Sequence, residues 1–187
     1  MSTTLSTLET KVRNLLGDIS ITGTDVFTYG NSNVFTLTES NVNTVTRVYR
    51  NNIDMGDSEF GWNSDTNKVT ITLGLTSGDN IQIEYTYYPN YSSTEIQAYA
   101  RAALVHLSAN NYYTYEEVDS TIYPDPSEKD VNLIAMVASL LIEPDNKTYR
   151  LPDVSVNVPK DLPTHEKIRR TIMIAKKSIN GWIDIIG

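Results

Sequence analysis

The chain has 187 residues, of which 40% are hydrophobic and 20% charged, a composition typical of a globular protein with a sizeable core. Its formal net charge of −8 argues against a nucleic-acid binder that depends on overall basicity, because phosphate contacts need clustered Lys and Arg. It has no cysteine, which excludes disulfides and thiolate chemistry. The first residues lack a basic region followed by an apolar run, so we expect no signal peptide and synthesis in the cytoplasm of a host cell.

Residues 4–17 are predicted to form the first helix. Their apolar side chains recur at helical spacing, at Leu5, Leu8, Val12 and Leu15. Ser6 and Glu9 are candidates for its N-terminal cap, and Gly17 is a natural stop. We therefore expect a short amphipathic helix at the start of the chain.

Residues 20–88 follow a period of two, which predicts an antiparallel β module of four to six strands with Thr side chains facing solvent. The expected strands are 33–38, 44–50, 69–73 and 81–87. The last two are joined by a link that contains Gly78 and Asp79, residues that favour a turn. These two strands are therefore predicted to pair as a hairpin.

The helical period returns at residue 92. Ser92 and Glu95 form a capping-box pattern, which predicts a helix that runs to about Tyr113. One apolar face of this helix comprises Ile96, Tyr99, Ala103, Leu104 and Leu107. Residues 116–126 are acidic and include two prolines, so we expect a loop there.

Residues 131–142 are the most apolar stretch of the chain, since only Asn132 and Ser139 are polar. The run is too short to span a bilayer, which needs roughly 20 residues, and it predicts a helix buried on nearly every side. Ser127 with Asp130 is a second capping-box pattern, and Pro144 is expected to end the helix. A helix without a polar face must be surrounded, so we expect the other helices to pack around it.

Four prolines exclude a continuous helix from residues 144–163. Within this range an alternating pattern predicts a short strand or extended arm, which is able to add to the sheet edge of a neighbour. Its candidate interface residues are Val154, Val156 and Val158.

The last predicted helix begins at Thr164, which is expected to cap it. Its apolar residues form a heptad-like stripe, predicted to lie along another helix of this chain or of a neighbour: Ile168, Ile172, Ala175, Ile179, Trp182 and Ile186. Residues 160–187 also carry six basic against three acidic side chains. Candidate interface residues here are Arg169, Arg170, Lys176, Lys177, Trp182 and Ile186.

Three interpretations of this basic face remain open. In the first, it is a solvated surface that complements the helix dipole. In the second, it meets acidic neighbours in an oligomer, and in the third it lines a channel through which nucleic acid passes.

Taken together, these patterns predict an α+β chain. Residues 1–19 and 89–187 are expected to form a small helical bundle of about four helices, with the Pro-rich arm at 144–163. Residues 20–88 form the antiparallel β module, inserted between helix 1 and helix 2.

Signatures of enzymes are sparse. The only histidines, His106 and His165, are far apart in the sequence, and there is no Gly-rich phosphate loop, zinc-protease motif or nucleophile elbow. The Asp- and Asn-rich residues 54–59 and 63–67 lack the spacing of a calcium loop, and turns explain them better. We expect no catalytic residue, no metal and no cofactor.

Two tyrosine clusters are candidates for contact surfaces or for core packing. The first comprises Tyr85, Tyr87, Tyr88 and Tyr91, and the second Tyr112, Tyr113 and Tyr115. Both interpretations are open from the sequence.

The order of these patterns is distinctive. The alternating residues 68–87 run directly into Tyr91-Ser92-x-x-Glu95-Ile96, and then come an Arg101-Ala102-Ala103-Leu104 helix, the apolar helix, the Pro-rich arm and the amphipathic last helix. Over residues 68–187 this order resembles the head–tail connector proteins of tailed bacteriophages, also called adaptor or head-completion proteins. The resemblance lies in element order and local pattern.

The resemblance implies a virion structural protein of the neck, in which a small helical bundle carries a β insertion after its first helix. It implies a homo-oligomer, a dodecameric ring, that joins the portal protein to tail or neck proteins and surrounds the channel through which the DNA leaves. The β module of this chain is larger than the hairpins of the mostly helical connectors, which leaves its role open.

Two alternatives compete with the connector. In the first alternative, the chain is another structural component of a phage neck, tail or baseplate, and its β module binds a neighbour. In the second, it is a carbohydrate-binding module that uses Trp62 and the tyrosines as stacking platforms. Exposed rings on one sheet face would favour carbohydrate binding, and buried aromatic side chains would oppose it.

Overall fold

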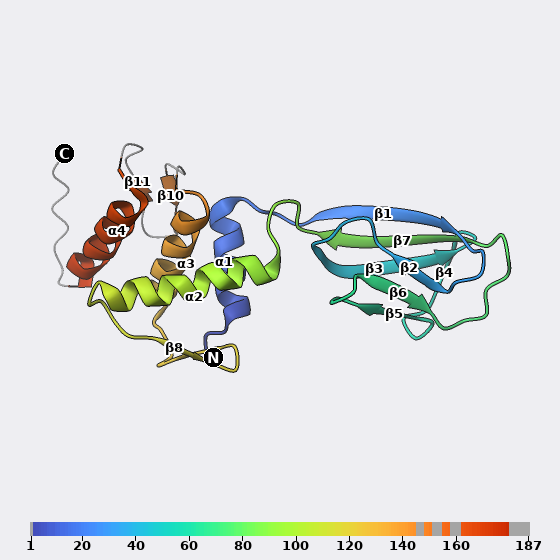
Figure 1. Cartoon of the computed structure of the whole chain (residues 1–187), viewed down its shortest axis with the longest axis horizontal. Coiled ribbons are helices and arrows are strands. Elements are labelled where there is room, and N and C mark those ends of the chain that lie inside the picture. Colours follow the sequence, from blue (N-terminus) through green and yellow to red (C-terminus); the bar gives the residue numbers. More distant parts are fainter. Residues whose placement is uncertain (1, 145–147, 151–154, 158–161, 180–187) are drawn as a thin grey trace. The chain divides into compact units, whose positions relative to one another are not determined.

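A computed structural model of the chain describes residues 2–144, 148–150, 155–157 and 162–179 (Figure 1). Two compact units are distinguished: unit 1 consists of Met1–Gly17 and Ser93–Gly187, and unit 2 of Asp18–Ser92. The predicted α+β fold, a helical bundle with an antiparallel β module inserted after the first helix, is confirmed. The borders of the insertion lie within a few residues of the predicted ones.

Unit 1 contains, among its described residues, four helices and two short antiparallel hairpins. The helices are α1 (Leu5–Leu16), α2 (Ser93–Ala109), α3 (Glu128–Ile142) and α4 (Thr164–Ile179). The strands are β8 (Glu116–Val118), β9 (Thr121–Tyr123), β10 (Thr148–Arg150) and β11 (Ser155–Asn157).

Helix α3 is the centre of unit 1, as the sequence predicts. It contacts α1, α2 and α4, and every side chain from Leu133 to Leu140 is buried. Its N-cap is Ser127, whose hydroxyl accepts a hydrogen bond from the backbone N–H of Asp130. Its last residue is Ile142, two residues before Pro144. No helix of the described residues has both the length and the apolar character that a membrane span requires.

Helix α1 begins differently from the prediction. Its N-cap is Thr4, whose side chain accepts from the N–H of Thr7, so the assignment of the cap to Ser6 and Glu9 was wrong. Ser6 lies two residues after Thr4, inside the helix, and so does not occupy the N-cap position. Gly17 ends the helix in the left-handed conformation, as expected.

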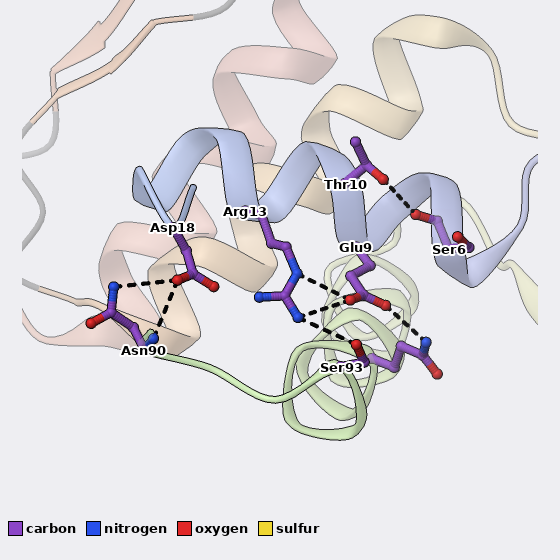
Figure 2. A network of polar contacts seen from close by, with 8 residues as sticks. Ser6, Glu9, Thr10, Arg13, Asp18, Asn90 and Ser93 are labelled. Atoms are coloured by element: carbon purple, nitrogen blue, oxygen red, sulfur yellow. Dashed lines mark hydrogen bonds and ion pairs between the residues drawn. The ribbon is translucent and has the colours of Figure 1, made fainter. Parts of the chain in front are cut away.

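Glu9 instead forms part of a buried polar network between α1 and α2 (Figure 2). Arg13 donates to Glu9 in an ion pair of 2.9 Å, and Gln97 donates to the other carboxylate oxygen at 2.9 Å. Arg13 also donates to the hydroxyl of Ser93. Burial pushes the pKa of Glu9 upward, but the hydrogen bonds from Gln97, Ser93 and Arg13 outweigh it and lower this pKa. The network ties the helix before the insertion to the helix after it.

Helix α2 ends at Ala109, four residues before the predicted end. Asn111 has a positive φ of 53°, and the N–H of Tyr112 returns to the carbonyl of Leu107, which turns the chain out of the helix. The acidic stretch that follows was expected to be a loop, but it contains the β8–β9 hairpin.

Unit 2 consists of two antiparallel sheets that enclose a core of their own. The four-stranded sheet has the order β1 (Ile21–Thr28), β7 (Asn80–Tyr87), β3 (Val42–Arg50) and β4 (Ile53–Asp54). The three-stranded sheet has the order β2 (Val34–Thr36), β6 (Lys68–Ile71) and β5 (Phe60–Asn63). The seven strands exceed the predicted four to six, and β1, β4 and β5 were not among the four strands whose ranges were predicted.

The predicted hairpin between the strands now labelled β6 and β7 was wrong. Each of these strands belongs to a different sheet, and their buried residues Ile71 and Ile83 belong to the same core from opposite sides. Alternation indicates which side chains face a core, but it does not indicate which strand is the hydrogen-bonded neighbour. The link between β6 and β7 is therefore a crossover from one sheet to the other.

Asp79 holds this crossover in place. Its carboxylate accepts from the N–H of Thr76 at 2.7 Å, pairs with Arg50 at 2.7 Å and accepts from the amide of Asn51 at 2.8 Å. Gly78 has a φ of 92°, a conformation that favours glycine. The predicted turn residues are thus present, but they connect two sheets.

A second polar contact joins the two ends of unit 2. Asp18 is 2% exposed, and its carboxylate accepts from the backbone N–H and the side-chain amide of Asn90, each at 3.3 Å (Figure 2). These residues lie at the start and the end of the inserted segment. The contact therefore holds the first and the last residues of unit 2 together.

The central position of α3 leads to a first prediction. Leu140 is fully buried, and Leu140→Ala should lower the free energy of unfolding of unit 1 by about 2–5 kcal/mol, because the surroundings cannot fill the cavity. Urea unfolding followed by the circular dichroism of the helices measures this loss. In the control Val105→Ala on α2, where Val105 is 68% exposed, the change should stay below about 0.5 kcal/mol. Equal losses in the two variants would contradict the prediction.

A second prediction concerns Gly23 on β1. A Cβ atom there would lie 2.6 Å from Cε2 of Tyr85, whose ring is 1% exposed and has no room to move aside. Gly23→Ala should therefore destabilise unit 2 by about 1–3 kcal/mol. Hydrogen exchange of the β1 and β7 amides measures the effect. Gly61→Ala is the matched control on β5, because no atom lies within 4 Å of its Cβ, and it should be neutral or slightly stabilising.

Candidate interaction surface

Helix α4 has an inner face that is part of the unit 1 core. Ile168 and Ile172 are buried, and α4 packs against α3. The first half of the predicted heptad-like stripe is therefore core within the chain itself. Ala175 is half-buried.

Two of the basic residues on α4 serve this packing. Lys167 is 3% exposed and donates to the carbonyl of Pro144, just after α3. Lys176 donates at 2.7 Å to the carbonyl of Asn110, just after α2, where the negative end of the α2 dipole favours a cation. These lysines hold α4 on the bundle.

The outer face of α4 carries the exposed side chains Arg169, Arg170, Met173 and Ile174, which we call the α4 stripe. Met173 is 45% and Ile174 44% exposed, so two apolar side chains lie beside two arginines on adjacent helical turns. Large apolar side chains beside arginine are characteristic of protein–protein interfaces.

Glu166 orients the two arginines. It pairs with Arg169 at 2.9 Å and with Arg170 at 3.1 Å. These hydrogen bonds lower the pKa of Glu166 to about 2, so its carboxylate stays charged over the whole physiological range. The α4 stripe therefore keeps two fixed guanidinium groups with one local counter-charge.

Several predicted interface residues lie outside what the structure describes. Val154, Val158, Trp182 and Ile186 are outside the described residues, and the side chains of Val156 and Lys177 are likewise not described. The backbone of Val156 belongs to β11, which pairs with β10 of the same chain. The predicted strand is thus present and pairs within the chain on one edge, and its addition to the sheet edge of a neighbour stays a prediction.

The β8–β9 hairpin is a second exposed feature of unit 1, which sequence reasoning missed. Its two-residue turn is Asp119-Ser120, with φ values of 48° and 62° that fit a tight hairpin turn. The chain before α1 runs along β9: Ile122 donates to the carbonyl of Thr3, and Leu5 donates to that of Ser120. The sequence pattern that would predict this hairpin is weak, because each of its strands has only three residues.

The hairpin has an inner and an outer face. Inward, Ile122 is buried and Glu117 pairs with Arg101 of α2 at 2.9 Å. The outer face comprises Glu116, Val118 and Tyr123, and we call these residues with Asp119 the hairpin face. Val118 is 53% and Tyr123 51% exposed, and Glu116 lies directly opposite Tyr123 in the strand register.

A tyrosine–aspartate cluster joins the end of α2 to the start of α3 and supports the hairpin. The hydroxyl of Tyr112 donates to Asp130 at 2.5 Å, Tyr115 also hydrogen-bonds this carboxylate, and Ser127 donates to it at 2.7 Å. Burial pushes the pKa of Asp130 upward, but these hydrogen bonds outweigh it and lower the pKa. The second tyrosine cluster is thus mainly structural, although Tyr113 is 53% exposed.

The first tyrosine cluster contributes to packing rather than to an aromatic platform. Tyr85 is 1% exposed in the core of unit 2, and Tyr87 and Trp62 pack partly buried against that core. The most exposed large apolar side chains of unit 2 are aliphatic: Ile19, Ile21, Val26, Val34, Ile53 and Leu73.

The described residues contain no group of three or more His, Asp or Glu side chains able to hold a metal ion. His106 is half-buried on α2 and His165 is exposed at the start of α4. The Asn-rich residues 63–67 form a turn, in which the N–H of Thr66 donates to Asn63.

The tyrosine–aspartate cluster leads to a third prediction. Asp130→Asn should lower the free energy of unfolding at neutral pH by about 1–3 kcal/mol, because the hydroxyls of Tyr112 and Ser127 lose a charged acceptor. The folded-state pKa of Asp130 is lowered, so this stabilisation is present above the unfolded pKa of about 3.9 and is lost as the pH falls through the folded value. The difference between the variant and the wild-type chain should therefore shrink in acid.

Urea unfolding at neutral and at acidic pH measures this difference. Glu128→Gln is the control on the same helical turn, because the Glu128 side chain is 84% exposed, and it should change stability little at either pH. A constant difference between the Asp130→Asn variant and the wild type at all pH values would contradict the prediction.

No protein-family model matches this chain, and no curated protein matches it either. Function is therefore inferred from the order of the elements and from the exposed faces of unit 1.

Proposed function

We propose that this protein is a head–tail connector subunit of a tailed bacteriophage. It acts as a virion structural protein in the neck, where copies of the chain form a ring between the portal protein and the tail or neck proteins, around the channel for the DNA. Its function is to bind and to position neighbours, and it carries out no catalysis.

The order of the elements supports this proposal. A helical bundle is interrupted after α1 by an antiparallel β unit and ends in an amphipathic, basic helix. The sequence resemblance to connectors rests on this same order. Unit 1 is compact around α3, so its remaining exposed apolar side chains are available for contacts with other subunits.

The single observation that carries the proposal is the α4 stripe. Two arginines and two exposed apolar side chains lie together on the outer face of a helix whose inner face is fully used in the core. Met and Arg are enriched at protein–protein interfaces, so this combination with Met173 and Ile174 favours an interface over a merely solvated helix face.

The described aromatic residues favour this proposal over the carbohydrate-binding alternative. A sugar-binding platform needs exposed rings on one sheet face. In unit 2 Tyr85 is buried and Trp62 is half-buried against the core. A role in another part of a phage neck, tail or baseplate remains the second candidate, because its contacts require the same kinds of surface.

A fourth prediction tests the proposed function. The purified 21.0 kDa chain should form closed rings of a defined size, because a head-to-tail contact between identical subunits closes when its rotation divides a full turn. Light scattering across a wide concentration range, followed by electron microscopy of the largest species, measures this. Monomers at every concentration would contradict the proposal, and a closed dimer would favour a different component of the neck or tail.

A further inference from the structure

The charges of unit 1 are separated between two segments. Residues 116–130, which include the β8–β9 hairpin, carry six acidic side chains and one basic one. Helix α4, residues 164–179, carries five basic side chains and one acidic one. A protein whose net charge is −8 therefore has a strongly acidic and a strongly basic segment within one compact unit.

The two segments also carry exposed apolar side chains. On the hairpin face, Val118 and Tyr123 lie beside Glu116 and Asp119, both exposed carboxylates without an ion pair among the described contacts. On the α4 stripe, Met173 and Ile174 lie beside the two arginines. Each face thus combines a charge of one sign with two apolar side chains, and the signs are opposite.

The two faces do not meet within one subunit. Helix α4 packs against α3, whereas the hairpin is held by α2 and by the residues before α1. In Figure 1, α4 and β8 lie at different places within unit 1. A second copy of the chain is therefore needed to bring one face onto the other.

We propose that the α4 stripe of one subunit binds the hairpin face of the next copy of the chain. Arg169 and Arg170 meet Glu116 and Asp119, while Met173 and Ile174 pack against Val118 and Tyr123. This contact rests on the proposed function and specifies which surfaces join neighbouring subunits. Because two different faces are used, it is a head-to-tail contact, which closes into a ring when the rotation per subunit allows it.

Charge complementarity selects a protein partner for the α4 stripe over the phosphate backbone of DNA. Phosphate contacts depend on clustered cations, whereas here the carboxylate of Glu166 pairs with both Arg169 and Arg170 and would repel a phosphate. The hairpin face supplies both parts of the complement, carboxylates for the guanidinium groups and apolar surface for Met173 and Ile174. Both faces are on every copy, so a homo-oligomer needs no further component.

The test uses two charge-reversal variants of the full chain. The first is Arg169→Glu with Arg170→Glu, and the second is Glu116→Lys with Asp119→Lys. In each variant alone, the two faces carry the same sign, so self-association measured by sedimentation should weaken on the order of a hundredfold. When the variants are mixed in equal amounts, each face of one is complementary to a face of the other, and assembly should return.

A chain that carries all four substitutions should also assemble, because its reversed faces are again complementary. The matched control is Asp57→Lys with Asp65→Lys, two exposed residues of unit 2, which changes the net charge by the same amount as the second variant and should leave association unchanged. Far-UV circular dichroism verifies that every variant is folded. These outcomes together would support the contact.

Rings that form equally well in both charge-reversal variants would overturn this contact and leave the connector proposal intact. Weakened variants that are not rescued by mixing would also overturn it, because rescue depends on the two faces meeting. A wild-type chain that remains monomeric would overturn both the contact and the proposed function.

Cysteine cross-linking provides an independent second measurement, because the chain has no cysteine of its own. Ile174→Cys mixed with Val118→Cys should give a disulfide-linked dimer under mild oxidation. Ile174→Cys mixed with Thr70→Cys, an exposed residue of β6, is the control and should not. Equal yields in the two mixtures would contradict the proposed contact.

Discussion

The complete burial of α3 is the constraint on which unit 1 depends. A helix with no polar face can be stable in water only if other elements cover all its sides, and here α1, α2 and α4 do so. Because α1 precedes the β insertion and α2 follows it, the core forms only when the two parts of the chain are brought together. The buried network of Glu9, Arg13 and Gln97 secures that junction with charged groups that satisfy one another.

Unit 2 has a hydrophobic core of its own. Its buried residues all come from the inserted segment, with Ile81, Ile83 and Tyr85 of β7 facing Val69 and Ile71 of β6. The two polar anchors of unit 2, Asp18 with Asn90 and Asp79 with its three partners, are likewise internal. An insertion with its own core and its own closure adds a surface to the chain without disturbing the packing around α3.

Outside the two cores, the distinctive surfaces among the described residues of unit 1 are the α4 stripe and the hairpin face. Lysines that carry part of the basic character of α4 are used for packing, as Lys167 and Lys176 show. The arginines are left on the outer face, where their planar groups are suited to pairing with carboxylates. The same helix thus stabilises the bundle with one face and offers a contact with the other, a division that suits a protein whose proposed role is assembly.

The sequence alone determined the fold class, the buried helix with its Ser127 cap, and the place of the β module, because hydrophobic period and capping chemistry are local properties. Only the tertiary structure decided which strands pair, since β6 and β7 alternate alike but lie in different sheets. It also decided which basic residues of α4 are free to act, because burial depends on what packs against each face. The β8–β9 hairpin was missed for the same reason: its short strands are stabilised by the chain before α1, a contact between residues far apart in the sequence.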